Sequence, residues 1–126
     1  MRPTPRWALF LAILSVTQLL QACSRSSRGV PVDLGDPKRG QQAIVGFGCG
    51  ACHQIPGIRG ARGSVGPPLT AFATRTYIAG HLVNSPDNLI RWIVDPQAVE
   101  PGTAMPNLGV IPAVARDMAA YLYTLH

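Results

Sequence analysis

The sequence predicts a small all-α domain of three main helices joined by long loops. Segments 36–48, 85–95 and 111–126 each place a proline at the first helical position, where its missing N–H costs nothing. Residues 54–84 are rich in Gly, Pro and Thr and show no sustained alternation of polar and apolar side chains. No strand–helix–strand pattern is present. We therefore expect loop between the first two helices, with room for one short helix.

The first two helices have clear start signals. Asp36 is a favourable N-cap directly before Pro37, and Ser85 with Pro86 repeats the same signal. The second helix should end before Pro96, because the residue before a proline is restricted to extended conformations. The folded domain is thus predicted to begin at Asp36.

The last helix is predicted from an apolar face. Its apolar residues recur at helical spacing: Val114, Met118, Tyr121, Leu122 and Leu125. A stripe of this kind packs against the body of a domain.

Residues 1–22 are predicted to be an export signal. Arg2 and Arg6 precede an apolar run at 7–20 that is short and contains polar residues, which favours a secretory signal over an uncleaved membrane anchor. The sequence LLQAC resembles a bacterial lipobox, which implies lipidation of Cys23. The alternative is an ordinary signal with a chance cysteine at its end.

The segment that follows is predicted to be a lipidated tether. Residues 23–35 are polar, contain Ser, Gly and Pro, and show no periodicity. A flexible segment of this length has a typical reach of roughly 20 Å. We expect three parts in the chain: the signal, this tether and a domain at 36–126. The domain would be exported and held on the periplasmic side of a membrane.

The charge pattern limits the partners. The chain has eleven Lys and Arg against six Asp and Glu, a formal net charge of +5, and the arginines are scattered rather than clustered. Nucleic-acid binding needs a basic stripe or patch, so we expect no nucleic-acid partner. A mildly basic surface can steer an acidic protein partner.

Cys49, Cys52 and His53 form the pattern Cys-x-x-Cys-His, which has three possible chemistries. A thioredoxin-like dithiol needs a βαβ setting, which this sequence lacks. A structural zinc site needs four ligands, and the domain adds only His81 and His126. Covalent haem attachment needs this pattern alone: two thioethers and an adjacent histidine ligand to iron. The pattern therefore favours one covalent haem c.

A haem of this type requires a second iron ligand, for which methionine is a common choice. Met118 lies on the apolar stripe of the last helix, where it is expected to be core. Met105 lies in the loop PGTAMPNLG, which Pro101 and Pro106 stiffen. His53 and Met105 are therefore the predicted metal ligands.

These motifs together resemble class I cytochromes c. The similar stretches are CGACH at 49–53, GPPL at 66–69, LIRWIVDP at 89–96 and PGTAM at 101–105. Within that class the chain is most similar to the cytochrome c domain of haem–copper oxidase subunit II. It lacks the cysteines and histidines of that subunit's dinuclear copper site. The resemblance implies a small cytochrome c fold, helices and loops wrapped round a covalent haem.

The resemblance also implies roles for residues around the haem. The carbonyl of Pro67 should accept a hydrogen bond from the ring of His53. Trp92 should pack beside the methionine, and Thr103 and Arg75 should interact with propionates. Further apolar contacts to the haem are expected from Leu69, Leu89 and Ile93. Tyr121 should pack against the first helix near Gly40 and Ile44. His81 has no expected role beyond that of an exposed loop residue.

With both iron ligands supplied by the protein, no open position remains for a substrate, which predicts an electron carrier rather than an enzyme. We expect a membrane-tethered protein that passes single electrons between respiratory complexes, with a terminal oxidase as a partner suggested by the resemblance alone. The alternatives are a fixed haem subunit of a periplasmic dehydrogenase, or a haem-based redox sensor. No small-molecule substrate is expected.

Overall fold

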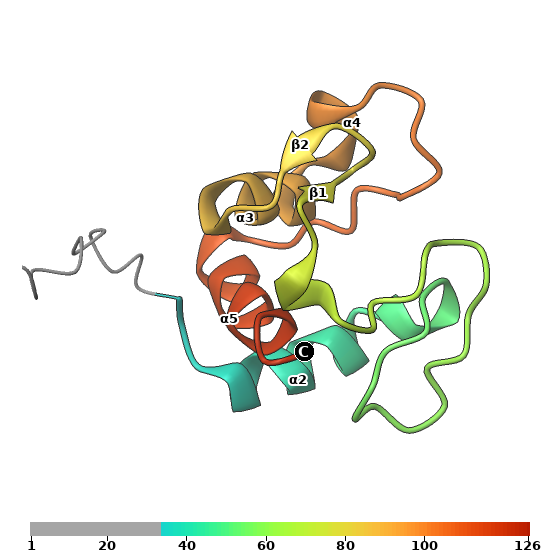
Figure 1. The fold of residues 1–126 in the computed structure, drawn as a ribbon, viewed down its shortest axis with the longest axis vertical. Coiled ribbons are helices and arrows are strands. Elements are labelled where there is room, and N and C mark those ends of the chain that lie inside the picture. Colours follow the sequence, from blue (N-terminus) through green and yellow to red (C-terminus); the bar gives the residue numbers. More distant parts are fainter. Residues whose placement is uncertain (1–33) are drawn as a thin grey trace, which may run out of the picture. The chain divides into compact units, whose positions relative to one another are not determined.

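The computed structural model describes residues 34–126, so the predicted signal, Cys23 and nearly all of the tether lie outside the described residues. The described part is mostly helical, as predicted (Figure 1). In chain order its elements are α2 (Pro37–Gly46), η2 (Cys49–Ala51), η3 (Phe72–Thr74), β1 (Tyr77–Ile78), β2 (Leu82–Val83), α3 (Pro86–Val94), α4 (Pro96–Val99) and α5 (Pro112–Leu122). None of the helices within 34–126 is long and apolar enough to cross a membrane.

Helix α2 begins as its sequence predicts. The Asp36 carboxylate accepts hydrogen bonds from the amides of Lys38 at 2.7 Å and Arg39 at 3.2 Å, which satisfies two of the free N–H groups at the helix start. The same capping holds for α3, where the Ser85 hydroxyl accepts from the amide of Asn88 at 3.4 Å.

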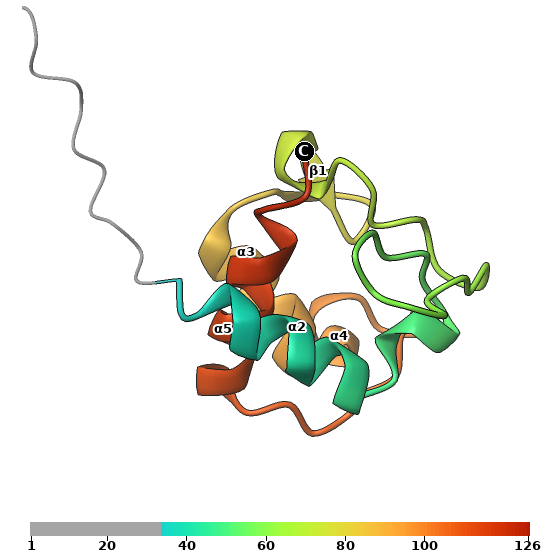
Figure 2. The ribbon, with the colours of Figure 1, turned by 90° about the horizontal axis from the view of Figure 1, so that it is seen from below.

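Helices α2 and α5 lie side by side and form the frame of the fold (Figure 2). Gly40 is in closest contact with the α5 backbone, because a Cβ at this position would overlap the carbonyl of Asp117 and lie 3.0 Å from the amide of Met118. The atoms nearest to Gly40 thus belong to Asp117 and Met118, and the expected packing of Tyr121 near Gly40 and Ile44 stays a prediction. Tyr121 sits one turn further along and donates from its hydroxyl to the carbonyl of Pro56 at 2.6 Å.

A polar clamp joins the same two helices at the start of α2. Asp117 of α5 accepts a hydrogen bond from the amide of Asp36 at 2.6 Å. It also accepts two from the guanidinium of Arg39, at 2.8 Å from Nε and 2.9 Å from Nη2. Paired hydrogen bonds from one guanidinium fix orientation as well as distance. The frame is therefore held by close backbone contact and by a bidentate ion pair.

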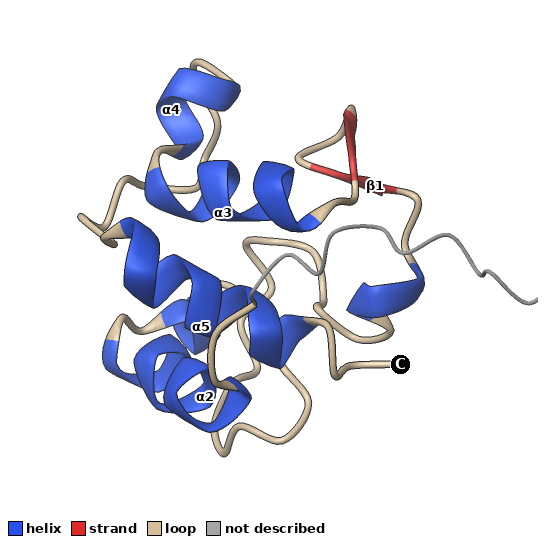
Figure 3. Cartoon of the chain, turned by 90° about the vertical axis from the view of Figure 1, so that its left-hand side faces the viewer, coloured by secondary structure: helices blue, strands red, loops and turns tan. Residues whose placement is uncertain are grey.

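The segment predicted as loop contains more structure than expected. The short helix is the 3-10 turn η3, but β1 and β2 also pair antiparallel, with Tyr77 opposite Val83 (Figure 3). The side chain of Asn88 in α3 donates to the carbonyl of Val83 at 3.0 Å and holds this hairpin against α3. Strands of two residues are too short to show alternation in a sequence.

The second helix also continues differently from the prediction. Helix α3 ends before Pro96 as expected, but the chain enters the further short helix α4 at once. The Asp95 side chain caps it by accepting from the amide of Ala98 at 3.1 Å. Pro96 is nearly inaccessible to solvent, so α4 starts from a fixed point.

The core lies between α2, α3 and α5 and is apolar. Ile44, Leu89 and Met118 each expose only 2% of their surface, and Met118 is a core residue as predicted. Full burial of a side chain of this size stabilises a fold by about 1.5–3 kcal/mol. These residues also form the floor of the site described next.

Candidate cofactor site

The Cys-x-x-Cys-His motif is built on the tight turn that follows α2. The amides of Cys52 and His53 both donate to the carbonyl of Cys49, at 3.2 and 3.0 Å. Cys49 and Cys52 are free cysteines rather than a disulfide. Burial raises the pKa of the Cys49 thiol. The attacking cysteine of a reactive dithiol has a lowered pKa, and the shift at Cys49 is in the opposite direction.

The ring of His53 is held by two neighbours. Its Nδ1 donates a hydrogen bond to the carbonyl of Pro67 at 2.8 Å, the contact that the sequence resemblance implied. Gly66 lies directly against the ring, because a Cβ there would come within 2.7 Å of Nδ1 and 2.8 Å of Nε2. A carbonyl only accepts, so Nδ1 carries the proton and Nε2 keeps its lone pair for a metal.

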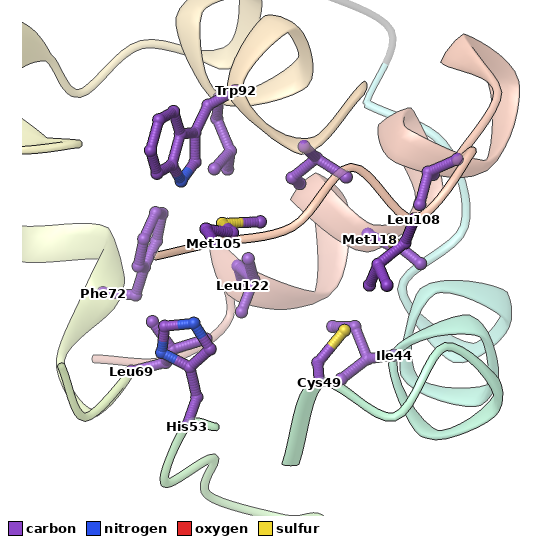
Figure 4. A pocket seen from close by; sticks show the side chains of 13 residues that line it. Ile44, Cys49, His53, Leu69, Phe72, Trp92, Met105, Leu108, Met118 and Leu122 are labelled. Atoms are coloured by element: carbon purple, nitrogen blue, oxygen red, sulfur yellow. The ribbon is translucent and has the colours of Figure 1, made fainter. Parts of the chain in front are cut away.

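Met105 reaches the same site from the loop between α4 and α5. Pro101 and Gly102 form a turn in which the amide of Thr103 donates to the carbonyl of Glu100 at 3.1 Å. Gly102 has φ +84°, which suits the third position of a type II turn. In the view of Figure 4, His53 projects from below, Met105 lies above it, and Trp92 is beyond Met105.

His53 and Met105 line one cavity of about 510 Å³. The residues predicted to bind the cofactor line it, from Cys49 and Cys52 near α2 to Thr103 and Met105, except Leu89 and Ile93. An adjoining cavity of about 80 Å³ shares Cys49, His53 and Met105 and is closed by core residues. The larger cavity, of about 510 Å³, is within the range of small-molecule sites, about 300–1,000 Å³.

The walls of the two cavities are mainly apolar. Leu69 lines both of them, as predicted, and Leu89 and Ile93 line the smaller one. Phe72 and Leu108 line both cavities and were not predicted. Each is a large apolar residue in a segment between the main helices, where no apolar helix face explains its presence. That is the sequence signal that could have identified them. The apolar walls, two cysteines, a histidine and a thioether together fit a large flat cofactor attached through sulfur.

The two predicted propionate contacts have partners within the protein. The Arg75 guanidinium lies over the ring of Phe72 at 5.5 Å and donates to the carbonyls of Pro68 and Thr70, the latter at 3.1 Å. The Thr103 hydroxyl accepts from the amide of Met105 at 3.4 Å. Both residues line the cavity, and their contact with propionates stays a prediction. His81 is exposed, and its Nδ1 lies 3.2 Å from Oε2 of Glu100.

The fold and this site define a haem protein of the c type, and comparison with known proteins agrees. The protein-family model for cytochrome c matches residues 37–126, so the chain belongs to the cytochrome c family. The predicted small all-α cytochrome c fold is confirmed. Membership in this family implies a covalent haem c, for which Cys49, Cys52 and His53 have the required sequence.

Individual relatives sharpen the resemblance. The chain is 40% identical to cytochrome c oxidase subunit 2 of Alkalihalophilus pseudofirmus over 68 residues, which are 54% of this chain and 19% of that protein. It is 36% identical to cytochrome c oxidase subunit 2 of Bacillus sp. PS3 over 66 residues, 51% of this chain and 18% of that protein.

A third relative is the cytochrome c-type cyt cy of Rhodobacter capsulatus, 33% identical over 100 residues, 72% of this chain and 50% of that protein. The chain thus spans about a fifth of the length of the oxidase subunits and half of the cytochrome cy. Membership in the cytochrome c family indicates a role in electron transfer.

Proposed function

We propose that this protein is a membrane-tethered electron carrier that passes single electrons between respiratory complexes, with a terminal oxidase as one partner. The observation that carries the proposal is that His53 and Met105 line one apolar cavity together with both cysteines. The names of the oxidase subunits among the relatives support the choice of partner.

The residues of the chain would act by holding the cofactor in a fixed setting. When bound, the haem supplies an iron centre that takes up and releases one electron. The hydrogen bond from His53 to Pro67 fixes the imidazole and makes it a stronger ligand. The Met105 thioether would supply the second iron ligand and raise the reduction potential. Apolar walls limit the access of water and so the reorganisation that accompanies a change of charge.

The ligand assignment is tested by absorption spectra of the haem-loaded protein. Covalent haem with methionine ligation gives a sharp α-band when reduced and a weak far-red band when oxidised. Met105→Ala should abolish the far-red band while the haem stays attached. Met118→Ala is the matched control, because it removes a buried methionine that lies on α5. If the control loses the band and Met105→Ala keeps it, the assignment of Met105 is wrong.

The second part of the proposal is the anchor. Export by residues 1–22 and lipidation of Cys23 would hold the carrier close to complexes in the same membrane and raise their effective concentration. Cell fractionation tests this: the wild-type chain should sediment with membranes, and Cys23→Ala should move it to the soluble periplasmic fraction. Wild-type protein in the soluble fraction, or a variant that stays on the membrane, would contradict lipid anchoring while leaving the haem assignment untouched.

A further inference from the structure

We propose that Gln97 is the positioning residue that holds the Met105 loop in the shape that brings the thioether to the cavity. The inference rests on the proposed role of Met105 as an iron ligand. Gln97 does not line the cavity; it acts through the backbone of the loop that carries Met105.

Gln97 makes three hydrogen bonds to this loop with one side chain. Its Nε2 donates to the carbonyl of Thr103 at 2.9 Å and to the carbonyl of Met105 at 3.0 Å. Its Oε1 accepts from the amide of Gly102 at 3.1 Å. Both amide protons and the amide oxygen are thus used, and only this orientation of the carboxamide suits two carbonyls and one N–H.

Apart from the turn hydrogen bond from the Thr103 amide to the Glu100 carbonyl, few other contacts fix this loop. Pro101, Gly102, Ala104 and Pro106 are all exposed, and Met105 is only half-buried. Hydrogen bonds rather than apolar burial must therefore determine the shape of this segment. The Thr103 hydroxyl adds one long contact of 3.4 Å to the amide of Met105.

The backbone around Gln97 is well fixed. It follows Pro96, which is nearly inaccessible to solvent, and α4 is capped by the Asp95 side chain. The side chain of His81, in the turn of the hairpin, also approaches this segment, with Nδ1 at 3.2 Å from Oε2 of Glu100. Both side chains are well exposed, and even a fully charged exposed pair contributes little to stability. Gln97 is therefore the principal side-chain link between α4 and the Met105 loop.

The chemistry of the contact is specific to glutamine. Gln97→Ala removes all three hydrogen bonds. Gln97→Glu retains the acceptor for the amide of Gly102, but it loses both donors and turns a carboxylate toward the carbonyls of Thr103 and Met105. Both changes should raise the population of loop conformations in which the thioether is displaced.

The experiment uses the haem-loaded full chain and imidazole, which competes with a methionine for the iron. We expect imidazole to bind oxidised Gln97→Ala and Gln97→Glu about ten-fold more tightly than wild type, with a weakened far-red band, because each lost hydrogen bond contributes modestly to the closed loop. Gln41→Ala is the matched control: Gln41 is a glutamine whose Nε2 donates to the carbonyl of Gly57 at 2.9 Å, in a different loop. It should leave imidazole binding and the band unchanged.

The outcomes separate this inference from the proposed function. A wild-type protein without a far-red band would contradict methionine ligation itself. If wild type has the band and Met105→Ala lacks it, but both Gln97 variants bind imidazole as wild type does, the role of Gln97 is wrong. Equal tightening in Gln41→Ala would overturn it too, since general loosening of the fold would then be the cause. The amide of Gly102 should exchange hydrogen faster in Gln97→Ala than in wild type or in Gln97→Glu, because only Gln97→Ala removes its acceptor.

Discussion

The α2–α5 frame and the Met105 loop hold their residues by different means. In the frame, the backbones of α2 and α5 touch at Gly40, and buried apolar side chains surround the contact. In the loop, mostly exposed residues are held by hydrogen bonds from Gln97. Steric contact in a packed core tolerates little change, whereas exposed hydrogen bonds each contribute about 0.5–1.5 kcal/mol. Changes in the frame should therefore alter stability, and changes in the loop should alter ligand exchange.

The largest effect is expected at the helix contact. Gly40→Ala places a methyl group on the Asp117 carbonyl, which is backbone and cannot rotate away, so α2 and α5 must separate. We expect a loss of about 3 kcal/mol in the free energy of unfolding, measured by urea denaturation of the haem-loaded protein.

Gly46→Ala provides the control, because it lies at the end of the same helix and a Cβ there would meet nothing within 4 Å. It should be neutral or stabilising by up to about 1 kcal/mol, since alanine favours the helix. Similar losses in both variants would mean that the backbone contact at Gly40 is not the cause of the loss, and the distinction between frame and loop would fail.

A smaller effect, and a pH-dependent one, is expected at the clamp. Hydrogen bonds from the Arg39 guanidinium and the Asp36 amide hold the pKa of Asp117 below its usual value of about 3.9. A lowered folded-state pKa gives stability that is present above the unfolded value and lost as pH falls through the folded value. The stability difference between wild type and Asp117→Asn should therefore be largest near neutral pH and shrink below about pH 4.

A double-mutant cycle controls this prediction. Arg39→Ala should cost less in the Asp117→Asn background than in wild type, because the pair is already broken. Additive losses, or a difference between wild type and Asp117→Asn that stays constant from neutral to acid pH, would show that the ion pair does not link the two helices.

The three main helices could be predicted because their signals are local. Asp36, Ser85 and the three prolines mark helix starts through contacts within a few residues. The main cofactor-binding residues could also be predicted from the sequence, because Cys-x-x-Cys-His and the loop around Met105 are each recognisable motifs. The family resemblance then supplied Pro67 and Trp92.

The rest depends on contacts that leave no pattern. Helix α4 was missed because Pro96 ends one helix and, with Asp95 as cap, starts the next. The hairpin was missed because its turn uses Ala79 at φ +50°, where glycine, asparagine or aspartate is the usual signal. The hydrogen bonds of Gln97 join residues up to eight positions apart in a non-repeating loop, and no periodicity reports them.

The pairing of α2 with α5 also bears on the order in which the molecule folds. Asp36 and Asp117 are 81 positions apart, so this contact can form only once the whole chain between them is present, and it costs the entropy of closing that loop. Met118 and Leu122 of α5 close one wall of the smaller cavity. Until α5 docks, that wall is missing, and Cys49, which lines the same cavity, is more accessible to whatever joins a cofactor to it. Attachment can thus precede folding, and the docking of the last helix would then enclose what has been attached.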